Sequence, residues 1–290
     1  MASQWSMDVL RAGALRLDGG SMFGVVPKAL WSRMVSCDDQ NRIDLQTNCL
    51  LLHDGTTRVL IETGFGDKWS DKERGIFHLE RRTIVDALAE HEVEPGDIDH
   101  VIVSHLHFDH AAGLTRLDET GAPTLTFPNA EIIVQRTEWD DALANKSTMT
   151  RTYLRSHLDP IVARVRLVDG DAEVLPGIHV WPMVGHTWGQ HAIRFDDGRG
   201  TVAFVGDVMP TVHHVGLAFS LAYDMLPHEN MRSKRTLLEQ AASEGWRLVL
   251  DHEPGPPCVT VAPDADRPGQ FRLQTLDGGG SPRRHGGHGG

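Results

Sequence analysis

The stretch that decides the fold is His105-Leu106-His107-Phe108-Asp109-His110, in which four of six side chains can bind a metal through nitrogen or oxygen. In an extended segment, residues i and i+2 point to the same side. His105 and His107 can therefore bind one ion together while Leu106 points into the protein. Hydrogen-bonded core histidines would have to cluster in this way by accident, so the motif predicts a metal site.

Asp109 and His110 follow at a point where the chain must turn, which lets them reach a second ion beside the first. Two ions about 3.5–4 Å apart form a recognised hydrolytic arrangement. The run before the motif, residues 99–104, is short, apolar and rich in β-branched side chains, which is typical of a strand buried on both faces. The predicted ligands therefore lie at the carboxyl end of a strand.

The same arrangement occurs three more times, because further short apolar runs end at a residue that can bind a metal. Residues 178–185 lead to His186, residues 201–206 to Asp207 and residues 247–251 to His252. Strands that deliver ligands at one edge of a sheet converge on one cleft. We therefore predict seven ligands with Asp207 bridging two ions: His105, His107 and His186 on one ion, and Asp109, His110 and His252 on the other.

Strand-like and helical runs alternate along the chain. Residues 58–61 and 131–134 have the composition of strands, and residues 83–92 and 138–144 that of helices. A further helix, capped by Asn230 or Ser233, is expected to pass through 237–241 and to end at Gly245. These runs predict an α/β fold: an αββα sandwich of two mixed β-sheets packed face to face and flanked by helices.

From about residue 40 to residue 255, the pattern resembles the metallo-β-lactamase fold superfamily. Asp207 resembles the bridging aspartate of its glyoxalase II, lactonase and phosphotriesterase-like branches, which class B β-lactamases lack. Further segments are similar to N-acyl-homoserine lactonases and to methyl parathion hydrolase: 21–28, 41–43, 210–214 and 222–224. The resemblance implies a dinuclear metal-dependent hydrolase.

Two positions depart from the pattern of that family. Many members have Asp-Thr-Gly after the second apolar strand, where this chain has Glu62-Thr63-Gly64, and a longer carboxylate could still orient a ligand histidine. Some lactonases have a tyrosine three residues after the bridging aspartate, where this chain has Pro210. An oxyanion donor must then come from elsewhere. We expect the nearby His214 to act in catalysis and His213 to contact the substrate.

The composition fits one enzyme domain. With 290 residues, 40% of them hydrophobic, the chain can bury a large core, and we expect a single domain over 1–277. Residues 278–290 are rich in glycine and are predicted to form a disordered tail. Cys37, Cys49 and Cys258 are odd in number and widely spaced, which predicts neither disulfides nor a thiolate metal site.

The formal net charge is −12, and no run of Lys or Arg is long enough to follow a phosphate backbone, which argues against nucleic acid as a partner. The first residues lack the basic start and apolar core of a signal peptide, and no apolar run approaches the ~20 residues of a membrane span. We therefore expect a cytoplasmic protein that binds a small-molecule substrate and no membrane. Whether the chain forms a homodimer stays open.

The metals determine the expected chemistry. Two divalent ions that share a water lower its pKa toward ~7, which supplies hydroxide without a serine or cysteine nucleophile. Asp109 would hold that hydroxide and pass its proton to the leaving oxygen. Nitrogen and oxygen ligands suit zinc, the metal we expect, and also iron, cobalt or manganese.

An apolar pocket above the metals would suit an acyl chain or an aromatic ester. The side chains that could form it are Met22, Phe23, Trp31, Phe65, Phe108, Leu217 and Phe219. We expect a lactonase that opens N-acyl-homoserine lactones and thereby quenches quorum sensing. The alternatives are an organophosphate triesterase, a glyoxalase II-like thioesterase or mononuclear iron sulfur dioxygenase, and a binding protein without turnover.

Overall fold

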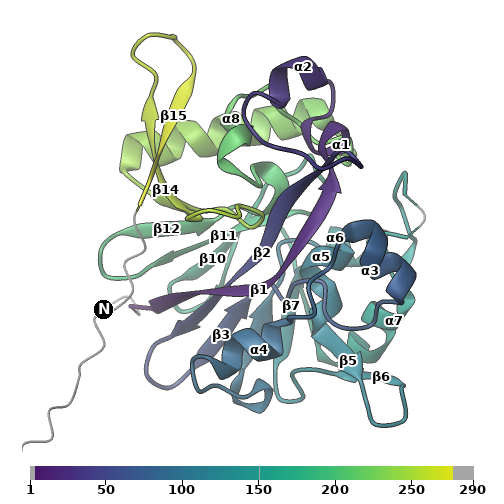
Figure 1. Cartoon of the computed structure of the whole chain (residues 1–290). Helices are drawn as coiled ribbons and strands as arrows, with labels where there is room; N and C mark the ends of the chain where they lie inside the picture. Colours follow the sequence, from purple (N-terminus) through teal and green to yellow (C-terminus); the bar gives the residue numbers. More distant parts are fainter. Residues whose placement is uncertain (1–3, 150, 277–290) are drawn as a thin grey trace, which may run out of the picture.

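The computed structural model describes residues 4–149 and 151–276, so the predicted tail at 278–290 lies outside the described residues. Two β-sheets pack face to face, and helices cover the outer face of each (Figure 1). The predicted αββα sandwich is therefore confirmed. That residues 1–277 form a single domain stays a prediction.

The first sheet has the strand order β1-β2-β3-β4-β7-β8. Its first three strands are antiparallel, and β4, β7 and β8 continue the sheet in parallel. The strands are β1 (Ser6–Asp18), β2 (Arg42–His53), β3 (Arg58–Ile61), β4 (His100–Ile102), β7 (Glu131–Gln135) and β8 (Val165–Val168). The helices on its side of the molecule are α3 (Asp71–Phe77), α4 (Ile84–Ala89), α6 (Arg136–Leu143) and α7 (Arg155–Leu158) (Figure 1).

The second sheet has the strand order β15-β14-β13-β12-β11-β10-β9, in which β12 and β13 are parallel and the other neighbours antiparallel. The strands are β9 (Ala172–Leu175), β10 (Ile178–Pro182), β11 (His191–Asp196), β12 (Thr201–Phe204), β13 (Arg247–Val249), β14 (Cys258–Pro263) and β15 (Phe271–Thr275). Helix α8 (Pro227–Glu244) packs on the outer face.

Short elements lie between these strands and helices along the chain. They are α1 (Gly19–Phe23), α2 (Lys28–Trp31), α5 (Phe108–Ala111), the β5 (Thr115–Leu117) and β6 (Pro123–Leu125) hairpin, and 3₁₀ turns at Pro95–Asp97, Ala112–Leu114, Asp159–Arg164, Gly206–Val208 and Val212–Val215. None of the helices in the described part of the chain combines the length and apolar character that a membrane span requires.

Side chains along the strands alternate between the two faces of the first sheet, as a period of two requires. Leu60 and Val101 pack outward beneath α4 and α6, whereas Ile61 and Ile102 pack inward. There they meet residues of the second sheet such as Phe204. A third cluster lies between the second sheet and α8. The sandwich therefore has three apolar layers, as four stacked layers require, and a fourth apolar cluster around α1 and α2 adjoins them.

The strands that lead to predicted ligands end earlier than the apolar runs suggested. β4, β10, β12 and β13 end at Ile102, Pro182, Phe204 and Val249, before the predicted ends at 104, 185, 206 and 251. The chain leaves the sheet at these points and turns inward. The last residues of each run therefore belong to the loops that carry the ligands.

The predicted cap of α8 was wrong. The helix begins at Pro227 after Leu226, whereas Asn230 and Ser233 lie inside it. Proline is favoured in the first helical turn because its fixed φ suits the helix and its missing N–H would have no partner there. The C-terminal prediction is confirmed, because Gly245 has the left-handed φ of 68° that favours glycine.

The inner apolar layer provides a test of the fold. Replacing Ile102, which is fully buried between the sheets, by Ala should lower the free energy of unfolding by about 2–5 kcal/mol, because a cavity remains. Ile76→Ala is the control, because that side chain on α3 is 49% exposed and its loss should cost about 0.5 kcal/mol or less. Urea unfolding of both variants measures the difference, and equal effects would contradict the assigned layers.

Candidate metal centre

All seven predicted ligands lie at one edge of the sandwich, just beyond the ends of strands from both sheets. Two come from the loop after β4, two from α5, and three from the turns after β10, β12 and β13. Every one of them is buried, with no more than 7% of its surface exposed. In chain order they are His105, His107, Asp109, His110, His186, Asp207 and His252.

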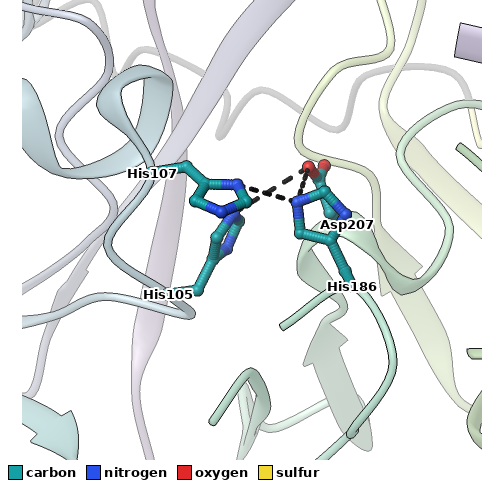
Figure 2. A group of neighbouring side chains, drawn as sticks. All are labelled: His105, His107, His186 and Asp207. Atoms are coloured by element: carbon teal, nitrogen blue, oxygen red, sulfur yellow. Dashed lines mark hydrogen bonds and ion pairs between the residues drawn. The ribbon is translucent and has the colours of Figure 1, made fainter. Parts of the chain in front are cut away.

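The first group of ligand atoms comes from both sheets. His105 and His107 face His186 and Asp207 across a small gap (Figure 2). The Nδ1 atom of His107 is 2.9 Å from Nε2 of His186, and Oδ2 of Asp207 is 3.0 Å from the same Nε2. Nε2 of His105 lies 3.9 Å from Oδ2 of Asp207. These four side chains can offer three nitrogens and one oxygen to a single ion.

A second group adjoins the first and shares Asp207 with it. The Nε2 atoms of His110 and His252 are 3.2 Å apart, and Oδ1 of Asp207 is 3.3 Å from Nε2 of His252. The carboxylate of Asp109 lies 3.8 Å from Nε2 of His110 and 3.6 Å from Nε2 of His252. The structure therefore brings the predicted second set together as well, with Asp207 between the two groups.

Asp251 is a further candidate ligand that the sequence analysis missed. It completes the second group with His110, Asp207 and His252, and one of its oxygens has no hydrogen-bond partner among the described residues. Burial, and then the charge of Asp207, raise the pKa of Asp251 well above its ordinary value. Its place directly before His252 at the end of a predicted strand was an available signal.

The spacing of these atoms fits a metal ion. Four ligands at zinc distances of ~2.0–2.2 Å in a tetrahedron put neighbouring ligand atoms about 3.3–3.6 Å apart. The separations given above range from 2.9 Å to 3.9 Å, and all the ligand atoms of each group lie within 4.8 Å of one another. In addition, Nε2 of His105 and Oδ1 of Asp207 are buried without a hydrogen-bond partner among the described residues. Buried polar atoms of this kind normally have a partner, and a cation between them would supply it.

The electrostatics of the first group also favour a cation. Burial, and then the neighbouring histidines, lower the pKa of His105 and His107, so both rings stay neutral as metal ligands must. Burial acts against the charge of His186, but Asp207 and Asp224 raise its pKa to about 10. A positive charge is thus favoured between His186 and Asp207, where an ion would replace the proton.

Polar groups behind the ligands hold the rings in place. Nδ1 of His186 donates to Asp224 at 2.9 Å, and Nδ1 of His252 donates to the carbonyl of Gln46 at 2.9 Å. Glu62 accepts from the backbone of Ser104 at 2.6 Å, and its other oxygen lies 3.5 Å from Nδ1 of His110. Glu62 therefore reaches a ligand histidine despite its extra methylene. Such contacts fix the tautomer and orientation of a metal-binding ring.

A cavity of about 480 Å³ opens directly above the ligands and includes Asp109, Asp207 and His252 in its wall. Most of the remaining wall is apolar, and it is formed by Leu17, Met22, Phe77, Phe108, Met149, Leu221 and Tyr223. Met22 and Phe108 were predicted there. A larger cavity of about 1110 Å³, along β1 and residues 255–258, contains none of the seven predicted ligands.

The structure places the other predicted substrate contacts outside the cavity wall. Phe23 is not in the cavity wall, because its ring is stacked between Trp31, at 5.5 Å, and His214, at 5.0 Å. Trp31 is likewise a buried core residue. His213 lies in the 3₁₀ turn Val212–Val215 and is absent from the wall. Aromatic character alone did not distinguish core packing from cavity lining.

His214 does not have the free ring nitrogen that an oxyanion donor needs. Its Nδ1 lies 2.8 Å from the hydroxyl of Thr211, and its Nε2 lies 2.8 Å from the carbonyl oxygen of Met22. The ring is fully buried and belongs to the support of the α1 loop. Tyr223 lies in the cavity wall together with Asp109 and Asp207, and it is one of three hydroxyl-bearing side chains there, the others being Thr148 and Thr152.

The fold and the two ligand groups define a metal-dependent hydrolase. Residues 42–252 match the model of the metallo-beta-lactamase superfamily, and the chain belongs to that family. The family predicted from the motif is thereby confirmed. Divalent metal binding follows from the family together with the histidine and aspartate groups.

Known relatives include lactonases. An N-acyl homoserine lactonase of Bacillus thuringiensis subsp. kurstaki is 32% identical over 182 residues, which cover 58% of this chain and 66% of that protein, just under two thirds of its length. A probable metal-dependent hydrolase from Staphylococcus aureus is 30% identical with a TM-score of 0.84, over 96% of this chain and all of that one. A dizinc quorum-quenching lactonase solved with its product shares the fold, with 19% identity and a TM-score of 0.77 over 96% of each chain.

The shared carboxylate provides a test of the metal centre. Asp207→Ala should lose at least one ion and nearly all hydrolysis, because the two cations would face each other without a common anion. Asp264→Ala is a matched control: Asp264 is also buried, but it pairs with Arg267 and Arg272. Elemental analysis of both variants measures the ion content. Two ions in Asp207→Ala, with parental rates, would contradict the bridging assignment.

Proposed function

We propose that the chain is a dinuclear lactonase that opens the ring of N-acyl-homoserine lactones, with zinc as the metal. The observation that carries this proposal is the apolar cavity of about 480 Å³ directly above the two ligand groups. Its floor is the proposed reaction centre and its walls can take an acyl chain. The Bacillus relative, named a lactonase for N-acyl homoserine lactones, supports the same substrate class.

The ions would supply the reactive chemistry, and residues of the chain would hold the ions. Two divalent ions, when bound, would supply hydroxide at neutral pH and would polarise the carbonyl of the substrate. His105, His107 and His186 would hold one ion, and Asp109, His110 and His252 the other, with Asp207 common to both. Asp251 stands behind the second set as an alternative oxygen ligand.

Asp109 is placed to move the proton. Its carboxylate lies both in the cavity wall and beside Nε2 of His110 and of His252. From there it can accept a hydrogen bond from the attacking water and return the proton to the ring oxygen that leaves. Geometry of this kind is the first requirement of a general acid and base.

Tyr223 takes the place of the donor that Pro210 cannot supply. Its ring lies in the cavity wall, and burial raises the pKa of its hydroxyl to about 12. The hydroxyl therefore stays protonated at neutral pH and can donate to the carbonyl oxygen of the substrate. Met22 and Leu221, in the same wall, would contact the acyl chain.

Charge distinguishes this substrate from the alternatives. The described cavity wall has one Lys or Arg side chain, Arg151, and that group is paired with Glu73 at 2.7 Å. A glutathione thioester carries carboxylates that would find no unpaired Lys or Arg in this wall, whereas an uncharged lactone needs none. Two adjoining ligand groups favour a dinuclear centre over a mononuclear iron dioxygenase. A neutral phosphotriester would fit the same wall and is included in the test.

The first functional test varies the acyl chain. Zinc-loaded protein should open acyl-homoserine lactones and favour longer chains, because each buried methylene contributes up to ~0.8 kcal/mol. Phe108→Ala should weaken long chains more than short ones, whereas Phe271→Ala, on β15 outside the cavity, should not change their ratio. Proton release in weak buffer measures the rates. If a thioester or a phosphotriester is hydrolysed and no lactone is, the lactonase proposal fails.

The second functional test removes one hydroxyl. Tyr223→Phe should lower kcat by about 100-fold, the scale of losing one oxyanion donor, and should leave the ion content unchanged. Because the ring stays, contact with the acyl chain is retained and KM should change little. Steady-state rates on one lactone, with elemental analysis, measure both quantities. A kcat equal to that of the parent would exclude Tyr223 as the donor.

A further inference from the structure

Glu138 is a fully buried carboxylate that makes no ion pair among the described residues. It lies in the first turn of α6 and accepts three hydrogen bonds. Its Oε1 accepts from the backbone N–H of Leu106 at 2.9 Å and from the hydroxyl of Tyr153 at 3.0 Å, and its Oε2 accepts from the hydroxyl of Thr187 at 2.6 Å. Burying a carboxylate is costly unless its oxygens are satisfied, and here neutral donors satisfy them.

Each donor is next to a histidine of the first ligand group. Leu106 lies between His105 and His107 in the sequence, and Thr187 directly follows His186. The ring of Tyr153 packs against His107 with 5.2 Å between ring centroids. The hydrogen bonds of Glu138 thus reach the chain beside all three nitrogen ligands of one proposed ion, and among the described residues none of them goes to a neighbour of the second set.

The two loops that Glu138 joins belong to different sheets. Residues 105–107 follow β4 of the first sheet, and residues 186–187 follow β10 of the second. The second loop also lies close against the start of α6, because a Cβ atom at Gly189 would be 2.2 Å from the backbone N of Glu138. The position of His186 relative to His107 therefore depends on contacts with one helical turn.

We propose that Glu138 is a positioning residue for the first metal ion. Its hydrogen bonds to Leu106 and Thr187 fix the loop after β4 against the loop after β10, and its hydrogen bond to Tyr153 holds the ring that packs on His107. Together they fix the 2.9 Å approach of His107 Nδ1 to His186 Nε2. The inference rests on the proposed dinuclear centre and adds a determinant of its affinity. Residues that orient metal ligands in this way typically change affinity by about 10–100-fold when removed.

Single-ion variants separate the two affinities. In a His252→Ala background the remaining zinc ion reports on the first ligand group, and in a His186→Ala background it reports on the second. Glu138→Ala should weaken zinc binding by about 10–100-fold in the first background and leave it unchanged in the second. Competition with a chromophoric zinc chelator measures both constants without any activity assay.

The conservative variant tests hydrogen bonding against charge. In Glu138→Gln, the amide oxygen can accept from Leu106 and Tyr153, and the hydroxyl of Thr187 can rotate to accept from the amide N–H. Zinc affinity in the His252→Ala background should therefore change by less than roughly tenfold, below the range expected for loss of the contacts. A loss as large as that of Glu138→Ala would overturn the positioning role.

Two smaller substitutions test the same inference if Glu138→Ala does not fold. Thr187→Val removes one donor and keeps the shape, so it should weaken zinc binding in the His252→Ala background. Thr126→Val is its matched control, because the Thr126 hydroxyl is buried and has no hydrogen-bond partner among the described residues. Equal zinc affinities in these two variants would overturn the inference.

The remaining outcomes distinguish this inference from the proposed function. A parent protein that binds no divalent ion overturns the metal centre and the role of Glu138 together. A parent that binds two ions, with neither affinity altered by Glu138→Ala, overturns the role of Glu138 alone. Equal weakening of both ions would show that Glu138 supports the whole fold and does not position one group.

Discussion

The carboxylate of Asp207 lies between two groups of buried imidazoles. The surrounding structure depends on how the negative charges buried around it are balanced by positive charge. Seven other Asp and Glu side chains among the described residues are buried, whereas Lys234 is the one buried Lys or Arg in that part of the chain. Five of the seven, Glu62, Asp109, Glu138, Asp224 and Asp251, contact the ligands or their immediate neighbours. Buried anions without cations are very costly, so bound metal ions would stabilise the folded protein as well as supply its chemistry.

The αββα fold suits this requirement because strand ends from both sheets meet at one edge. β4 supplies the local motif, while β10, β12 and β13 each supply one ligand from the opposite layer. The centre thus crosses the interface between the sheets. An ion held there links the two layers, and contacts such as those of Glu138 set how closely they approach.

The sequence predicted what local spacing determines. The motif at 105–110 and the apolar runs before His186, Asp207 and His252 were enough to give the family, the two layers and the proposed ligand set. Contacts between distant residues left no such signal: Nδ1 of His252 donates to the carbonyl of Gln46, 206 positions away. The sequence likewise did not indicate that Phe23 packs in a core stack, since an apolar ring is equally suited to a core stack and to a cavity wall.

Glu62 shows how the centre accepts local strain. It has a φ of 65°, in the left-handed region that costs a residue with a side chain on the order of 1–3 kcal/mol. In this conformation its carboxylate reaches both the backbone of Ser104 and the ring of His110. The ligand frame is therefore held by strained and buried groups that tolerate little change. The cavity wall, in contrast, comes from connecting segments around Met22, Phe77, Met149 and Leu221, which can vary without disturbing the metal ligands. This separation lets one hydrolytic centre serve different substrates, and under the proposed lactonase function those segments would determine the acyl-chain preference.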